Sequence, residues 1–311
     1  MAAPSPGVLP PSGEQHVIEH GRARAVITEV GATLRAYSVD GRAVVDGFAE
    51  PDICRDGRGQ VLCPWPNRLG DGRYEFAGRR AQAALDEPAR RNAIHGLVRY
   101  QSWALRGRAQ NTVTLGCVLQ PQPGYTWRLG MEVEYRLGKG GLTVRAEATN
   151  LDGVPAPLGV GFHPYLTVGT PDLDTARLHL RAERQLRTDD RGLPVGEEPV
   201  AGSEVDFSVP RPIGPTRLDT AFGGIGRDAD GLARVELSHP DEDRRVTLWM
   251  DSAFRYLMLY SADRVGDGDR RRRALAVEPM TCPPDALRSG TDLVTLGPGG
   301  GWRGTWGISP S

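Results

Sequence analysis

The chain has 311 residues, of which 39% are hydrophobic and 25% are charged, and its formal net charge is −1. This describes a globular protein with enough apolar residues for a large core. A charge so close to zero argues against nucleic acid and membrane surfaces as partners, because both attract a basic excess that this chain lacks. Lys139 is the only lysine and lies in a Gly-rich stretch, so a lysine Schiff base is not indicated.

The cysteines and the N-terminus carry little functional signal. Cys54, Cys63, Cys117 and Cys282 are scattered, without a Cys-x-x-Cys motif or a histidine at zinc-ligand spacing, so neither a disulfide framework nor a metal site is predicted. Residues 1–13 are rich in Pro, Ala, Ser and Gly and lack the features of a secretion signal, so they are predicted to form a flexible tail. No apolar run approaches the roughly 20 residues that span a bilayer. We expect a cytoplasmic protein that does not contact membranes.

Short strands separated by turns dominate the rest of the chain. Residues 142–149 alternate between apolar and polar side chains, which is typical of a strand with one buried face, and residues 128–137 follow a similar pattern. Residues 138–141 and Asp40-Gly41 can supply the positive φ angles of tight hairpins. Further strands are predicted at 23–30, 33–39, 73–76, 112–119, 178–181, 234–237, 246–250, 256–260, 274–277 and 293–296. With no internal repeat and no long linker, residues 14–311 are predicted to form a single all-β domain, a large antiparallel β-sandwich with very little helix.

His163 lies in the apolar segment Val160 to Tyr165, and Pro164 after it favours an extended backbone. In an extended segment the neighbours of His163 can pack on one side while the imidazole points into a cleft on the other. The alternative is a core histidine whose ring bonds to a backbone carbonyl.

Two earlier segments carry further candidates. The loop from Cys63 to Gly72 presents Asn67 and Arg68 side by side, a donor-rich couple suited to holding hydroxyl oxygens, although Arg68 could instead pair with a structural carboxylate. His95 precedes a glycine that would give a ligand room to approach.

The second half of the chain adds two carboxylates and a basic segment. Asp219 stands near Phe222 after a Pro-rich loop and could alternatively cap a turn. Glu278 ends an apolar strand just before a proline, an unusual position for a charge, and its alternative role is an ion pair with an arginine. The arginine run at 270–273 is interpreted as part of a solvated surface loop, outside any cleft.

Taken together and in order, these segments resemble the aldose 1-epimerase (galactose mutarotase) family. The resemblance rests on Gly31-Ala32-Thr33-Leu34, Asn67-Arg68-Leu69-Gly70, His95-Gly96, the block from Gly161 to Tyr165, and Asp219 with Glu278-Pro279. The chain resembles the family over nearly its whole length.

The resemblance implies a galactose mutarotase-like supersandwich with a sugar in an open cleft. It implies Glu278 as the general base and His163 as the general acid, with His95 as a second imidazole on the side of the ring oxygen. Asn67, Arg68 and Asp219 would hold the sugar hydroxyls. The reaction would interconvert the α and β anomers of a hexose and would need no cofactor and no metal. The partner would be a small-molecule sugar, and the protein would be a monomer or a weak homodimer.

Two segments depart from the family pattern and leave the sugar open. The His-Gly pair continues as Leu97-Val98-Arg99, and the chain reads Met258 to Ala262 where many members carry a glutamine before Tyr-Thr-Gly. A phosphorylated or sulfonated sugar is one alternative, with Arg68 and Arg99 as the candidates that would meet its anion. Another is a non-catalytic sugar-binding protein on the same scaffold. Glycoside hydrolysis is a third, but it usually needs two facing carboxylates and only Glu278 is suited.

Overall fold

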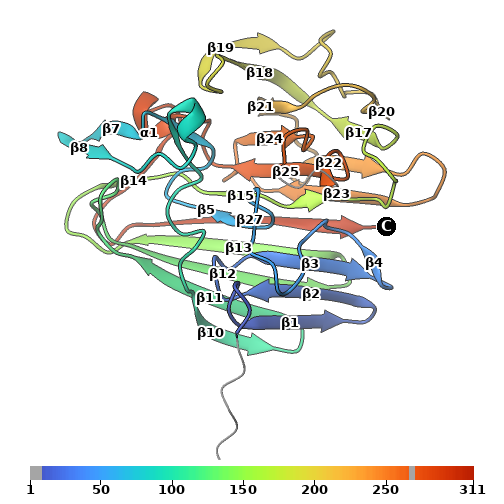
Figure 1. Ribbon diagram of the computed structural model, residues 1–311, viewed down its shortest axis with the longest axis horizontal. Helices are drawn as coiled ribbons and strands as arrows, with labels where there is room; N and C mark the ends of the chain where they lie inside the picture. Colours follow the sequence, from blue (N-terminus) through green and yellow to red (C-terminus); the bar gives the residue numbers. More distant parts are fainter. Residues whose placement is uncertain (1–8, 266–269) are drawn as a thin grey trace, which may run out of the picture.

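The computed structural model describes residues 9–265 and 270–311, and nearly all regular structure in them is β-strand (Figure 1). The helices among these residues are one 3-10 turn, η1 (Pro88–Arg90), and one short α-helix, α1 (Ala286–Ser289). The predicted antiparallel sandwich with very little helix is confirmed. Within the described ranges, no helix has the length and apolar character needed to cross a membrane.

The largest sheet has nine strands and forms one layer of the sandwich. Its spatial order is β10 (Ala104–Ala109), β11 (Thr112–Leu119), β12 (Leu129–Gly138), β13 (Gly141–Asn150), β27 (Gly301–Pro310), β23 (Arg245–Met250), β22 (Ala233–Ser238), β17 (Arg177–Leu180) and β20 (Arg211–Pro212). In β12 every second residue is buried, because one face of the strand packs on the core. The predicted hairpin is present, with Gly138 paired to Gly141.

Two further sheets cover this layer. The first contains β1 (Gln15–His20), β2 (Ala23–Thr28), β3 (Leu34–Val39) and β4 (Arg42–Ala43), and it packs over β11 and β12 (Figure 1). The second contains β19 (Pro194–Pro199), β18 (Ala182–Thr188), β21 (Asp219–Ile225), β24 (Tyr256–Tyr260), β25 (Leu275–Met280), β15 (Gly161–Phe162) and β5 (Val61–Leu62), with β16 (Tyr165–Leu166) also paired to β25. This eight-stranded sheet contacts the nine-stranded one through Phe162, whose ring lies 5.1 Å from that of Trp306. The smaller ribbons are β6 (Arg68–Gly70) with β9 (Asn92–Ile94), β7 (Arg73–Phe76) with β8 (Arg79–Gln82), and β14 (Ala156–Leu158) with β26 (Val294–Leu296).

Several strands were not predicted, most clearly β27. Its sequence is rich in glycine, which is depleted in strands. Two of these glycines are needed by neighbours: a Cβ on Gly304 would lie 2.6 Å from the Trp302 ring, and one on Gly307 would lie 2.4 Å from the Trp249 ring. Indole rings therefore cover the strand where side chains are missing, and tertiary packing overrides the low propensity.

The N-terminal tail was predicted to extend to residue 13, and residues 1–8 lie outside the described residues. Just before residue 14, however, Ser12 and Gly13 are buried. The Gly13 N–H donates to the Pro10 carbonyl at 2.8 Å, and the Val30 N–H donates to the Ser12 carbonyl at 3.0 Å. The folded part of the chain therefore begins a few residues earlier than expected.

The arginine run at 270–273 is only partly a solvated surface. Residues 266–269 of the same predicted loop lie outside the described residues. Arg271 is exposed as expected, but Arg272 pairs with Asp174 at 2.6 Å and with Asp263 at 2.9 Å. Arg272 thus ties three segments together.

Candidate active site

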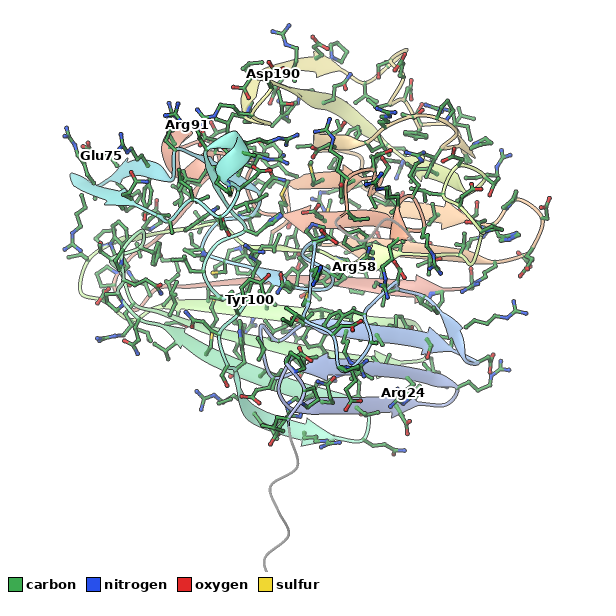
Figure 2. All side chains as sticks on the ribbon, in the orientation of Figure 1. Arg24, Arg58, Glu75, Arg91, Tyr100 and Asp190 are labelled. Carbon is green, nitrogen blue, oxygen red and sulfur yellow. The ribbon has the colours of Figure 1, made fainter. Side chains whose placement is uncertain are left out.

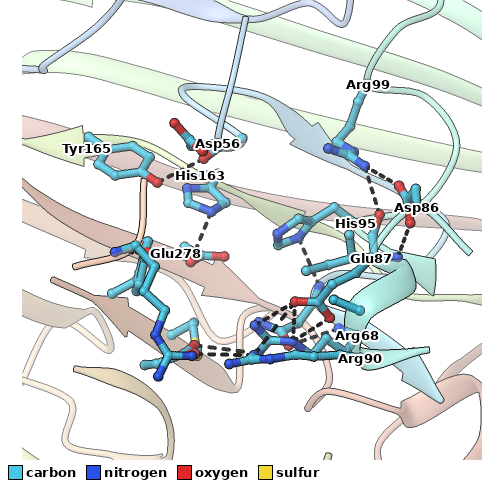
Figure 3. Close-up of a pocket in the computed structure, with 18 residues that line it drawn as sticks. Asp56, Arg68, Asp86, Glu87, Arg90, His95, Arg99, His163, Tyr165 and Glu278 are labelled. Carbon is cyan, nitrogen blue, oxygen red and sulfur yellow. Dashed lines mark hydrogen bonds and ion pairs between the residues drawn. The ribbon is translucent and has the colours of Figure 1, made fainter. Parts of the chain in front are cut away.

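A cleft of about 440 Å³ opens over one face of the eight-stranded sheet (Figure 3). All residues predicted as catalytic or sugar-binding line it, namely Asn67, Arg68, His95, His163, Asp219 and Glu278. They come from five separate segments of the chain. The fold therefore brings the predicted site together.

Sheet register explains how the floor of the cleft forms. Glu278 pairs with Met258 of β24, and Tyr260, two residues further along β24, pairs with Asp219 of β21. Residues at alternate positions of a strand share one face, and so do directly opposed residues of neighbouring strands. These four side chains therefore point into the cleft together.

His163 and Glu278 face each other across two antiparallel strands. Gly161 of β15 pairs with Met280 of β25, and β16 continues the same alignment beyond His163. His163 is thus the residue opposite Glu278. Its Nε2 lies 3.3 Å from Glu278 Oε1 (Figure 3). The alternative ion pair between Glu278 and an arginine is not what the structure forms.

Burial shifts the pKa values of both partners toward their uncharged forms. It lowers the pKa of His163 to about 3. It raises the pKa of Glu278 well above its usual value, and the Asp219 carboxylate adds to this effect while Arg68 opposes it. Such a coupled pair shares one proton, either as carboxylic acid beside imidazole or as carboxylate beside imidazolium. Burial favours the first form.

Each partner also has one buried polar atom without a hydrogen bond to any described residue: Nδ1 of His163 and Oε2 of Glu278. Unpaired buried polar atoms are costly in a folded protein and are concentrated at functional sites.

His95 is held in one protonation state by its neighbour in the cleft wall. The Asn67 N–H donates to His95 Nδ1 at 3.2 Å, so this nitrogen is an acceptor and the neutral ring carries its proton on Nε2. Burial, followed by the nearby His163, lowers the pKa of His95 well below its usual value. The two rings meet edge to face, with centroids 5.2 Å apart. His95 is therefore a neutral hydrogen-bond donor.

The glycine after His95 has a different role from the one predicted. A Cβ on Gly96 would lie 2.1 Å from the Cys63 carbonyl oxygen. Gly96 therefore allows close packing of two backbone segments, rather than the approach of a ligand.

His95, His163 and Glu278 place three potential metal-ligand atoms within 4.8 Å of one another. Histidines that bind a metal normally donate a hydrogen bond from the other ring nitrogen to a carbonyl or carboxylate. In His95 that nitrogen, Nδ1, instead accepts a hydrogen bond from the Asn67 N–H. Coordination of a metal through Nε2 would move the ring proton to Nδ1, where it would point at the Asn67 N–H. The donor set suits proton transfer better than metal binding.

An ion-pair network formed by Arg68, Glu87, Arg90 and Asp219 borders the cleft. Arg68 Nε donates to Glu87 at 3.0 Å, and Arg68 Nη1 lies 3.5 Å from Asp219. Arg90 lies 3.7 Å from each of the two carboxylates. Burial alone would lower the pKa of Arg68, but Asp219 and Glu87 outweigh it and raise the pKa. The alternative proposed for Arg68, a carboxylate partner, is thus present while Arg68 still lines the cleft.

Asn67 and Asp219 differ from simple turn residues. Asn67 has φ 55° and its side-chain oxygen accepts from the Arg68 N–H at 2.9 Å, which fixes the corner between loop and strand. Asp219 begins strand β21, so its alternative role as a turn cap is wrong.

Sequence reasoning missed several lining residues, above all Asp86 and Glu87. Asp86 pairs with Arg99 at 2.7 Å and accepts from the Ile94 N–H at 2.7 Å. The two carboxylates precede the His95 segment by fewer than ten residues, and this proximity was the available signal. In a charged stretch they resembled solvated side chains.

Arg264 also lines the cleft and was not predicted to do so. It is exposed, and no described residue pairs with its guanidinium group; its backbone N–H donates to the Tyr260 hydroxyl at 2.9 Å. It contrasts with Arg68, Arg90 and Arg99, each of which pairs with a lining carboxylate.

The sandwich has the fold of solved galactose mutarotase-like structures. A GalM/aldose epimerase homologue from C. elegans has a TM-score of 0.84 at 19% identity, covering 96% of this chain and 99% of that one. A galactose 1-epimerase from Lactobacillus acidophilus has a TM-score of 0.81 at 20% identity, covering 96% and 94%. These similarities concern the fold.

The sequence comparisons go further. The uncharacterized protein YihR of Escherichia coli is 32% identical over 286 residues, covering 92% of this chain and 89% of YihR. The family model described as aldose 1-epimerase matches residues 14–309. The chain belongs to the aldose 1-epimerase family.

Proposed function

We propose that the protein is an aldose 1-epimerase that interconverts the α and β anomers of a hexose. The observation that carries the proposal is the 3.3 Å contact between His163 Nε2 and Glu278 Oε1 in the cleft. In a cyclic sugar the two oxygens that exchange protons are bonded to the same carbon, C1. A base and an acid that serve both must therefore lie side by side, as these two atoms do.

Ring opening uses the pair in its ionised form. Glu278 takes the proton of the C1 hydroxyl while His163 gives its proton to the ring oxygen; the bond from C1 to the ring oxygen breaks and a carbonyl forms at C1. The carboxylic acid and neutral imidazole that result are the forms that burial favours. After rotation about the C1–C2 bond, the reverse proton transfers close the ring on the other face of the carbonyl.

The remaining residues bind and orient the sugar. Neutral His95 donates from Nε2 to an oxygen on the ring-oxygen side, which adds no charge to the buried cleft. Asn67, Arg68 and Asp219 contact hydroxyls. Each charged group of the ion-pair network already has a partner of opposite charge. A neutral sugar hydroxyl can therefore form a hydrogen bond with one of these groups, and no charge in the network loses its partner.

An anionic sugar is a second candidate substrate, favoured by Arg264. The sequence suggested Arg68 and Arg99 for this role, but both are ion-paired. Arg264 lines the cleft and, within residues 9–265 and 270–311, none pairs with its guanidinium group. A phosphate or sulfonate group on the sugar would supply the Arg264 guanidinium with a partner of opposite charge.

The cleft fits two other functions less well. A binding protein has no need of a buried acid and base in contact. A glycoside hydrolase usually needs two carboxylates facing the scissile bond, whereas Asp86, Glu87 and Asp219 are each paired with an arginine.

The test is a panel of freshly dissolved pure anomers, followed by optical rotation or by anomeric NMR signals. The panel contains neutral hexoses and hexoses that carry a phosphate or sulfonate. We expect the wild-type protein to accelerate anomer exchange for at least one sugar, equally with and without a metal chelator. Absence of acceleration for every sugar would overturn the proposed function.

A further inference from the structure

A short segment that takes no part in the proposed chemistry, residues 56–60, lies against His163. The Gly59 N–H donates to the His163 carbonyl at 2.9 Å, and the His163 N–H donates to the Gln60 carbonyl at 3.2 Å. Gly57 has φ 72°, and a Cβ there would lie 2.6 Å from His163 Cδ2. The segment therefore fixes the backbone of His163 on both sides and packs against its ring.

At the centre of this segment lies Arg58, a guanidinium group that is only 3% exposed. In Figure 2, Arg58 is labelled near the middle of the view and Arg91 at its upper left. Its Nη1 donates to the Asp46 carboxylate at 2.6 Å and to the Asp46 carbonyl at 3.1 Å. A buried ion pair can often be replaced by apolar residues without loss of stability. Stability alone therefore does not explain why a charge is buried here.

The Arg58 guanidinium lies over the ring of Tyr165, 4.3 Å from its centroid. Tyr165 also contacts the His163 ring, nearly parallel to it at 16° with 5.1 Å between centroids. The Tyr165 hydroxyl donates to the Asp56 carbonyl at 2.8 Å, so the phenol is fixed at its outer end as well (Figure 3). Arg58, Tyr165, His163 and Glu278 thus contact one another in succession.

We propose that Arg58, with Asp46 as its counter-ion, is a positioning residue that holds the Tyr165 ring flat against His163 and so keeps the imidazole opposite Glu278. A cation over an aromatic face is attracted by the negative charge of that face, and the attraction is stronger where water is excluded. A methionine at position 58 would fill similar volume but would lose both this attraction and the bond to Asp46.

The charge of Arg58 also acts on His163 through space. After burial, which is the largest cause, Arg99 and Arg58 both lower the pKa of His163. Other titratable or charged groups around the ring are Glu278, His95, Tyr165 and Asp56. Removing the Arg58 charge therefore makes His163 more basic.

NMR of the histidine side chains tests the contact between Tyr165 and His163 without an activity measurement. The protein has six histidines, so ¹³C-histidine labelling gives few ring signals to assign. We expect Arg58→Met to move the His163 signals, because the stacked Tyr165 ring shifts them in the wild type. Arg58→Lys, which keeps the charge, should move them less. Arg55→Met, an exposed arginine of the same loop, should leave them in place.

The double variant Asp46→Leu/Arg58→Met guards against a folding defect, since it removes both members of the ion pair at once. It should show the same displaced His163 signals as Arg58→Met. Unmoved His163 signals in either folded variant would overturn the proposal.

The second experiment rests on the proposed function and measures anomer exchange. Arg58→Met should lower kcat about tenfold with KM within twofold, because the imidazole is misplaced while the sugar contacts remain. The acid limb of the pH–rate profile should move upward in Arg58→Met and stay in place in Arg58→Lys. An unchanged kcat and acid limb would overturn the proposal. Failure of the wild type on every sugar would overturn the epimerase function instead, and the NMR result would still decide the role of Arg58.

Discussion

Two regions of the same cleft differ in whether their ionisable side chains are ion-paired. His95, His163 and Glu278 lie on its floor and wall, are at most 8% exposed and have pKa values displaced toward their neutral forms. In the ion-pair network of Arg68, Glu87, Arg90 and Asp219, by contrast, each group has a partner of opposite sign. The buried trio has no arginine or lysine partner among the described residues.

This difference separates moving protons from holding a substrate. A group that gains and loses a proton in each turnover must be able to exist in both protonation states in the cleft. Ion-paired groups have the opposite property, since each is held in a defined geometry by a partner of opposite charge. The variants below test whether the two regions can be impaired separately, beginning with the largest expected effect.

Glu278→Gln removes the proton acceptor while keeping size and shape. We expect turnover to fall by about a hundredfold to ten-thousandfold with little change in sugar binding. Anomer exchange gives the rate, and calorimetric titration gives the affinity. His163→Asn should behave alike for the acid step. Near-normal turnover in Glu278→Gln would show that the base lies elsewhere.

Arg68→Met weakens the ion-pair network and leaves Arg90 as the remaining shared partner of Glu87 and Asp219. A charge-assisted contact is worth about 1.5 to 3 kcal/mol, so KM should rise by about tenfold to a hundredfold while kcat changes less. Arg91→Met, which removes an exposed arginine of the same region, is the matched control. A loss confined to kcat would place Arg68 with the proton-transfer residues.

The pKa of His163 predicts how stability depends on pH. Because burial lowers the folded-state pKa to about 3, protonation of the unfolded chain weakens the fold as pH falls from about 6.5 toward 3. At pH 5 this amounts to about 2 kcal/mol relative to pH 8. His163→Asn should remove that part of the slope in urea unfolding curves.

Glu278 acts with the opposite sign. Its raised pKa gives a stability contribution that is complete below the ordinary carboxyl range and is lost as pH rises through the folded-state value. The informative quantity is therefore the difference between the wild type and His163→Asn at each pH. Parallel curves from pH 8 to pH 5 would contradict the buried, neutral His163.

Arg264→Ala has the smallest expected effect. If the substrate is anionic, this exposed cation should contribute about threefold to tenfold in KM, and the contribution should shrink at high salt. A neutral hexose should be unaffected. Arg271→Ala removes an exposed arginine that does not line the cleft, and it controls for the loss of one positive charge from the surface. Equal effects on neutral and anionic sugars would remove the anionic candidate.

The sequence predicted the fold class because strand alternation and turn chemistry are local signals. β7, β11 and β24 have the predicted bounds, and β12 and β13 differ by one residue or so. The strand β27 escaped because its identity depends on tryptophans from elsewhere that cover its glycines. Packing of this kind cannot be read from the strand itself.

The site was predicted residue by residue but not in its arrangement. Motifs identified His95, His163 and Glu278, yet their contact depends on the pairing of strands that are far apart in the chain. The Asn67 N–H that fixes the state of His95 is a backbone group, which leaves no mark on the sequence. Arg58 was overlooked because an arginine between glycines resembles an ordinary turn.

His163, between β15 and β16, lies opposite Glu278 of β25, and this alignment bears on how such a protein can diversify. Strand alignment is fixed by the whole core, because a shift of one residue would turn buried side chains outward. The walls of the cleft, by contrast, come from connecting segments that tolerate insertion and replacement. Mutations in the connecting segments can therefore change the sugar preference during evolution. The alignment of His163 with Glu278 is kept at the same time, because a chain that loses this alignment also loses its core packing.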